Sequence, residues 1–295
     1  MSILQLSGSR VEYLEAGRGE PVILLHSSGS SGAQWHALAE RLCERYRVIA
    51  PDLYGYGGTG HWPGQRRFHL ECEAEIVLAL LGRVNQAVHL VGHSYGGAVA
   101  LHVAGLRGEL LRSLTLIEPA AFHLLRGMDA AALAEIEEVA QTVARAVACG
   151  EYVAGFERFV DYWTSPAAAP EIPAYKRYAM AARLPKIALE FHATLNEPTR
   201  LEHFRSVTVP TLLLYGTGSP SPTRRICDLL AHVLPRARLK PIGGAGHMAP
   251  VTHRSQVNAT ISAHLAAHSG HPSPGWMAAD ALSASNAASA ARSVA

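Results

Sequence analysis

The chain has 295 residues, of which 48% are hydrophobic and 17% are charged, and its formal net charge is +2. A chain of this length forms one large domain or two small ones, and its apolar content is enough for a sizeable buried core. It has no concentrated basic run, so we expect neither a nucleic-acid partner nor attraction of anionic substrates.

The cysteines and the apolar segments indicate the cellular compartment in which the protein is expected. The four cysteines are far apart and form no Cys-x-x-Cys pair, which is typical of free thiols in a reducing environment. The first residues lack the features of a signal peptide, and no apolar stretch approaches membrane-spanning length. We therefore expect a cytoplasmic protein without a membrane partner.

The chain begins with strand-like patterns. Residues 3–6 and 11–15 alternate like two paired edge strands, with a turn at Gly8-Ser9. Residues 21–25 form a continuous apolar run, typical of a strand buried on both faces of a parallel sheet. A small-residue loop over 26–32 follows this run.

Strands and helices then alternate along the chain. Further strands are expected over 47–50, 87–91, 113–117, 209–216 and 238–242. Helices are expected over 35–44, 70–81 (ending at Gly82), 95–106, 223–233 and 256–267. This alternation predicts an α/β fold with a doubly wound, mostly parallel sheet.

Residues 120–199 interrupt this alternation. Within them, residues 129–196 show no convincing strand pattern and contain helical stretches over 130–148, 152–163, 174–182 and 186–196, with breaks at Gly150, over 165–173 and at Pro185. We expect them to form a helical cap over the carboxyl edge of the sheet, with residues 1–119 and 200–268 as the core. The Ala/Ser-rich residues 269–295 have few large apolar side chains, and we expect no fixed structure there.

A Gly-x-Ser-x-Gly sequence joins the strand expected over 87–91 to the helix that follows it. Its central residue is Ser94, between Gly92 and Gly96. On such a tight turn the serine is held in a strained conformation, and the glycines let strand and helix approach closely. An ordinary Gly/Ser turn is the alternative, but the strand before it and the helix after it favour a nucleophile.

Four short motifs follow one another along the chain: His26-Ser-Ser-Gly, Asp52-Leu-Tyr-Gly-Tyr-Gly, Gly92-His-Ser-Tyr-Gly-Gly and Gly246-His247-Met248. From about residue 10 to 268, this order resembles the α/β-hydrolase superfamily, in its capped esterase, epoxide-hydrolase and C–C-hydrolase branch. It implies an α/β-hydrolase fold and, for substrate, only a broad range of chemistries. Epoxide hydrolases and haloalkane dehalogenases are disfavoured, because those families need a carboxylate where Ser94 stands.

The resemblance also implies roles for individual residues. His247, on the glycine loop after the last strand, corresponds to the base that a serine nucleophile requires. Backbone N–H groups of Tyr95 and Ser28 correspond to the oxyanion hole. Ser27 replaces the usual glycine, so either Ser27 or Ser28 supplies the second donor. We expect His26 to orient this loop and His93 to fix the underside of the turn.

The third member of a catalytic triad is not obvious. The usual position follows Gly216, where residues 217–222 include no carboxylate, and Asp228 falls inside the next helix. Some members of the superfamily carry the acid one strand earlier, where this chain has Glu118. We favour Glu118 as the residue that orients His247. The alternatives are a dyad in which Ser219 or water holds the histidine, and a structural Glu118 that caps the cap segment or pairs with an arginine.

We expect no cofactor and no metal. Residues 55–60 match Gly-x-Gly-x-x-Gly, but no helix follows to bind a pyrophosphate. Asp52 is interpreted as a structural brace between loops. The sequence also has no clustered Cys/His spacing for a metal.

The cap contributes a set of large side chains, some of which must face the nucleophile if the cap covers it: Phe122, His123, Phe156, Phe159, Tyr162, Trp163, Tyr178, Met180 and Phe191. We therefore expect a small apolar or aromatic ester-like substrate, and a monomer or homodimer. The predicted activity is hydrolysis of a carboxylic ester or lactone. The alternatives are a C–C bond hydrolase and a receptor-like protein that only binds its ligand, which the missing acid after Gly216 favours.

Overall fold

One eight-stranded sheet lies at the centre of the computed structural model, which describes residues 1–64, 66–165 and 168–270. In sheet order the strands are β1 (Ser2–Leu6), β2 (Ser9–Ala16), β4 (Tyr46–Pro51), β3 (Glu20–Leu25), β5 (Val88–His93), β6 (Leu111–Ile117), β7 (Thr211–Gly216) and β8 (Ala237–Ile242). β2 pairs antiparallel with both β1 and β4, and the remaining pairs are parallel. The predicted mostly parallel α/β sheet is confirmed.

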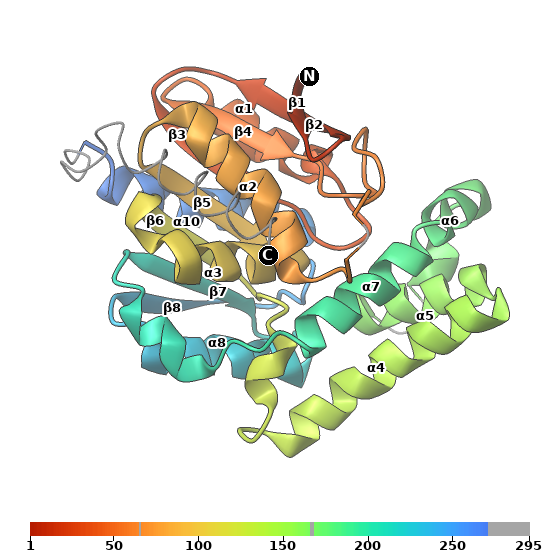
Figure 1. Cartoon of the computed structure of the whole chain (residues 1–295). Helices are drawn as coiled ribbons and strands as arrows, with labels where there is room; N and C mark the ends of the chain where they lie inside the picture. The colour runs from red at the N-terminus through yellow and green to blue at the C-terminus, as the bar shows by residue number, and fades with distance from the viewer. Residues whose placement is uncertain (65, 166–167, 271–295) are drawn as a thin grey trace, which may run out of the picture.

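Helices cover both faces of this sheet (Figure 1). One face packs against α2 (Leu70–Val84), α3 (Tyr95–Arg107) and α8 (Ser221–Val233). The other face packs against α1 (His36–Leu42) and α10 (Arg254–Ala267). Parallel strands buried on both faces need no polar side, which explains their continuous apolar sequences.

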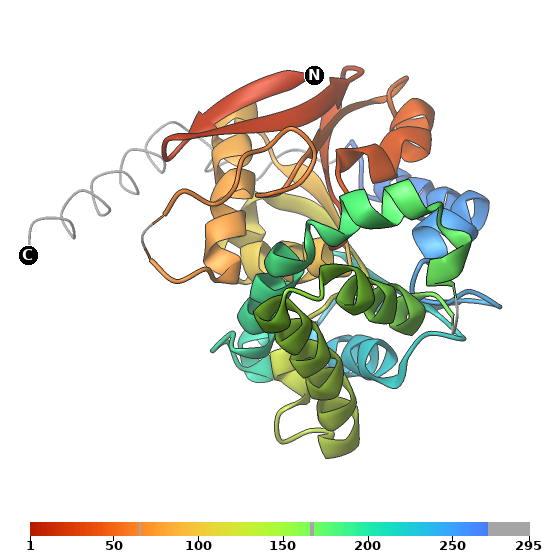
Figure 2. The same cartoon turned by 90° about the vertical axis from the view of Figure 1, so that its right-hand side faces the viewer.

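The predicted helical insertion lies between β6 and β7. It contains α4 (Ala130–Cys149), α5 (Tyr152–Trp163), α6 (Ala174–Ala181) and α7 (Leu184–Leu195). Figure 2 shows these green helices in front of the strands. Apart from residues 269 and 270, the terminal segment for which we expect no fixed structure lies outside the described residues.

Several predicted boundaries shift by one to a few residues, and three of them have a local structural reason. The first hairpin turns at Ser7–Gly8, one residue earlier than expected, where both residues have left-handed φ values. Helix α2 does not end at Gly82 but continues to the buried Val84, and Asn85 caps it with a φ of 50°. Pro185 does not precede a helix but lies in the first turn of α7, where no backbone N–H is required.

Asp52, immediately after β4, joins two loops as the sequence suggested. Its carboxylate accepts hydrogen bonds from the Gly32 N–H at 2.7 Å and from the Gly58 N–H at 2.9 Å. The side chain is buried, so loss of these acceptors would leave two backbone donors poorly satisfied. Asp52 thereby holds the loop after β3 against the loop after β4.

Substitution of Asp52 should therefore destabilise the fold. We expect Asp52→Ala to lower the free energy of unfolding by about 2–3 kcal/mol, and Asp52→Asn, which keeps one carbonyl acceptor, to cost less. Urea denaturation of the two variants and the wild type measures this difference. Equal stability of all three proteins would contradict the assigned role.

The described residues also contain no helix that is both long enough and apolar enough to cross a membrane.

Candidate active site

The sharp turn between β5 and α3 presents Ser94 with a φ of 54° and a ψ of −117°. This backbone conformation is strained for any residue other than glycine, so the surrounding structure has to hold it in place. Here the Ser94 N–H donates to the Ile117 carbonyl, and the Ser94 carbonyl accepts from the Ala120 N–H, both at 2.9 Å. A Cβ atom on Gly96 would lie only 2.5 Å from the His26 carbonyl oxygen, so glycine is required beside the serine.

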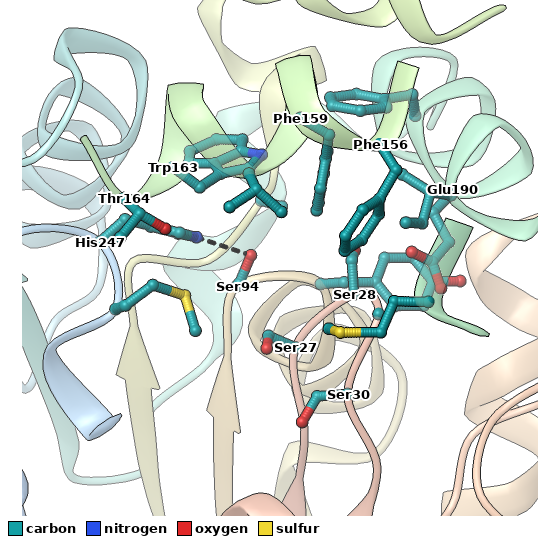
Figure 3. A pocket seen from close by; sticks show the side chains of 18 of the residues that line it. Ser27, Ser28, Ser30, Ser94, Phe156, Phe159, Trp163, Thr164, Glu190 and His247 are labelled. Atoms are coloured by element: carbon teal, nitrogen blue, oxygen red, sulfur yellow. Dashed lines mark hydrogen bonds between the residues drawn. The ribbon is translucent and has the colours of Figure 1, made fainter. Parts of the chain in front are cut away.

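Three side chains from separate loops meet at this turn. Ser94 Oγ lies 2.9 Å from His247 Nε2, and His247 Nδ1 lies 2.6 Å from Glu118 Oε2; Figure 3 shows the contact between serine and histidine. With the proton on Nδ1, His247 donates to the carboxylate, and its Nε2 accepts the serine hydroxyl. All three side chains are buried. The parallel strands β5, β6 and β8 bring their carboxyl ends to the same sheet edge, which explains the convergence.

The surroundings of Glu118 keep it ionised. Burial alone would raise the pKa of this carboxyl group, but the hydrogen bond and charge of His247 lower it, with help from the donors at Gly216 and Ser219, to about 2. The Gly216 N–H and the Ser219 hydroxyl donate to Oε1 at 2.6 and 2.5 Å. Ser219 thus contacts the carboxylate and not the histidine, which Glu118 contacts directly. In the dyad alternative, Ser219 or water would hold the histidine instead. None of these partners is an arginine.

This pKa predicts a loss of stability in acid. Because the pKa of Glu118 falls from 4.5 to about 2 on folding, its contribution to stability is present above pH 4.5 and disappears as the pH falls toward 2. Between about pH 5 and about pH 3 we expect the wild type to lose on the order of 2 kcal/mol more than Glu118→Gln. Urea denaturation at the two pH values measures this, and parallel losses in the two proteins would contradict it.

The loop after β3 lies beside the serine. Ser27, Ser28 and Tyr95 all line the cavity at Ser94, but the Ser27 N–H and hydroxyl donate to Gln34 Oε1 at 3.1 and 2.9 Å. Because the Ser27 N–H is already used, Ser28 is the better candidate for the second oxyanion donor.

His26 orients this loop. Its Nε2 accepts from the Leu53 N–H at 3.0 Å, so its Nδ1 carries the proton and donates to the Ser27 carbonyl at 2.8 Å. Burial lowers the pKa of His26 to about 4, which keeps it neutral. His26 thus orients the loop after β3, as expected, and it also ties this loop to the loop after β4.

His93 lies under the turn and connects it to the histidine loop. Its Nε2–H donates to the His247 carbonyl at 2.9 Å, and its Nδ1 accepts from the Gln34 amide at 3.2 Å. Burial and the neighbouring His247 lower the pKa of His93 to about 3. Gln34 therefore contacts Ser27 and His93, and through His93 it is connected to the backbone of His247. No sequence pattern pointed to Gln34, because its partners are distant in the chain.

A cavity of about 240 Å³ opens above Ser94, between the sheet edge and the cap. Of the predicted cap side chains, those that line it are Phe122, Phe156, Phe159, Trp163, Met180 and Phe191. The others have different surroundings: Tyr178 is exposed, Tyr162 donates to Glu135 and His123 contacts the Thr194 carbonyl. The Trp163 ring also lies 4.2 Å from the His247 ring, centroid to centroid, so the cap shields the base from water.

Within the described residues, no group of three or more His, Cys, Asp or Glu side chains is arranged to hold a metal ion.

Comparison with known proteins places this geometry in context. Residues 22–260 match the alpha/beta hydrolase family. The chain is 27% identical to a pimeloyl-acyl-carrier-protein methyl ester esterase from Aeromonas hydrophila, over 81% of this chain and 93% of the esterase. It is 37% identical to a 2-hydroxy-6-oxo-6-(2'-aminophenyl)hexa-2,4-dienoic acid hydrolase from Metapseudomonas resinovorans, over 37% of this chain and only 39% of that hydrolase.

A solved structure shares the fold. An alpha/beta hydrolase enzyme from a Medee basin deep-sea metagenome library superposes with a TM-score of 0.74 at 15% identity, over 90% of this chain and 97% of that one. At this identity the similarity shows the fold alone.

Proposed function

Because the chain belongs to the alpha/beta hydrolase family, we propose that it is a serine hydrolase that cleaves a carboxylic ester or lactone through an acyl-enzyme. The observation that carries this proposal is the pair of contacts from Ser94 Oγ to His247 Nε2 at 2.9 Å and from His247 Nδ1 to Glu118 Oε2 at 2.6 Å. They lie at the floor of a mainly apolar cavity, which favours a small apolar or aromatic acyl group.

In the proposed mechanism, Ser94 Oγ attacks the ester carbonyl while its proton passes to His247 Nε2. The N–H groups of Ser28 and Tyr95 stabilise the negative charge that develops on the carbonyl oxygen. His247 then gives the proton to the leaving alcohol, which departs and leaves the acyl group on Ser94. Glu118 stabilises the imidazolium. Water, deprotonated by His247, releases the acid product, and the proton returns to Ser94.

An acyl-enzyme can be detected directly. Rapid mixing of the protein with a p-nitrophenyl ester should release a burst of about one p-nitrophenolate per active site. Mass spectrometry of an acid-quenched sample should then locate the acyl group on the peptide that contains Ser94. Acylation at another residue, or no hydrolysis of any ester, would contradict the proposal.

Cleavage of a C–C bond by the same three residues is the second candidate. It is supported by the 37% identity over 118 residues to the dienoic acid hydrolase. Product analysis with an ester and with a vinylogous diketone of similar size separates the two activities. Preferential cleavage of the diketone would replace ester hydrolysis as the assigned reaction.

A further inference from the structure

One wall of the otherwise apolar cavity contains a buried carboxylate, Glu190 on α7. Its side chain is only 2% exposed. One oxygen, Oε1, accepts a hydrogen bond from Lys186 Nζ at 2.6 Å. The other, Oε2, is buried and has no hydrogen-bond partner within the described part of the chain. A buried acceptor without a donor at hydrogen-bond distance is costly, so this oxygen is suited to accept a hydrogen bond from a ligand in the cavity.

Glu190 lies in a buried cluster with a lysine, a second glutamate and two tyrosines. Lys186 Nζ also donates to the buried Glu73 at 3.0 Å, so two carboxylates share one ammonium group. The rings of Tyr56 and Tyr95 lie 5.0 and 4.8 Å from that ammonium. Burial and the neighbouring Glu190 raise the pKa of Tyr56, whose hydroxyl faces that carboxylate. The Tyr95 hydroxyl has no hydrogen-bond partner among the described residues. The cluster therefore presents one strong acceptor, Glu190, and one hydroxyl group, that of Tyr95, at the cavity wall.

The position of Glu190 indicates which part of a substrate would reach it. Figure 3 shows Glu190 and His247 on opposite sides of Ser94, with Ser28 between Ser94 and Glu190. The leaving oxygen has to lie near His247, because it takes its proton from Nε2. The acyl group therefore extends in the other direction, toward Glu190.

We propose that Glu190 is a specificity-determining residue that binds a hydrogen-bond donor, either an ammonium or a hydroxyl group, on an otherwise apolar acyl chain. This inference rests on the proposed ester hydrolysis and names its substrate class. A carboxylate at the same place on the acyl chain would meet the unpaired oxygen of Glu190 in a buried environment, where like charges repel strongly.

Substrate ranking tests this subsite. We would compare phenyl esters of unbranched acids of four, six and eight carbons that carry a terminal methyl, hydroxyl, ammonium or carboxylate group. At the best chain length, the hydroxyl or ammonium ester should exceed the methyl ester in kcat/KM by roughly 10-fold to 100-fold, with the carboxylate ester the poorest. If the wild-type protein prefers the methyl or the carboxylate ester at every acyl-chain length, this result alone would overturn the proposed subsite.

Variants identify the residue and the donor. Glu190→Gln removes the charge but keeps the shape, so the ammonium preference should fall to near unity while much of a hydroxyl preference remains. Glu138→Gln removes an exposed carboxylate from cap helix α4 and should leave the ranking unchanged. Circular dichroism verifies that both variants are folded. An unchanged ranking in folded Glu190→Gln contradicts a role for this residue.

The same experiments distinguish a missing Glu190 subsite from a missing esterase activity. Hydrolysis of all esters with a flat ranking would leave the serine hydrolase intact and remove the subsite. If no ester is hydrolysed, binding of the matching methyl esters to Ser94→Ala, measured by titration calorimetry, still tests the subsite. Tighter binding of the ammonium or hydroxyl ligand supports it, and equal affinities overturn it.

Discussion

Replacement of Ser94 by alanine is expected to lower kcat for ester hydrolysis by roughly 10³-fold to 10⁶-fold. The variant has no oxygen to form the acyl-enzyme, and its His247 has no hydroxyl to deprotonate. A small residual rate is expected, because the oxyanion donors and the cavity still bind and polarise the substrate. Steady-state rates with p-nitrophenyl esters, corrected for the uncatalysed reaction, measure the loss.

The matched control for Ser94→Ala is Ser206→Ala, which removes an exposed hydroxyl group outside the cavity. It should keep the rate within a few-fold of the wild type. If Ser94→Ala is as active as the wild type, the catalytic proposal fails. The receptor-like alternative, in which the fold only binds a ligand, would then be the better description.

Glu118→Gln is expected to lower kcat by roughly 10²-fold to 10⁴-fold. An amide at this position can donate a hydrogen bond to His247 Nδ1, which moves the ring proton to Nε2. His247 then faces Ser94 with a donor instead of an acceptor and is unable to take the serine proton. The amide also removes the negative charge that stabilises the imidazolium. Most of the loss should appear in kcat, because Glu118 does not line the cavity.

A second glutamate–histidine pair, in which the glutamate is buried and the histidine is partly exposed, provides the control for this change. Glu197 Oε2 lies 3.5 Å from His102 Nδ1, outside the cavity. Burial alone would raise the pKa of Glu197, but His102 and Thr199 lower it to about 2. Glu197→Gln should therefore perturb stability and leave kcat nearly unchanged. Wild-type kcat in Glu118→Gln would instead support a dyad of Ser94 and His247.

The local sequence was sufficient to predict those elements whose pattern lies within a short run of neighbouring residues. The apolar run at β3 and the Gly-x-Ser-x-Gly turn depend on residues within a few positions of one another, and both occur as predicted. Boundaries were less reliable, because a cap such as Asn85 or a buried residue such as Val84 can extend a helix beyond a glycine.

The sequence by itself determined the alternating fold, the strained turn at Ser94 and the motif that marks His247, since each is encoded by neighbouring residues. Only the tertiary structure decided the partner of that histidine. The sheet order places β6 between β5 and β7, which brings Glu118 to His247 and to the backbone of Gly216. Likewise, Lys186 and Glu73 are 113 positions apart in the chain. Contacts across such distances depend on strand order and helix packing, which no local pattern specifies.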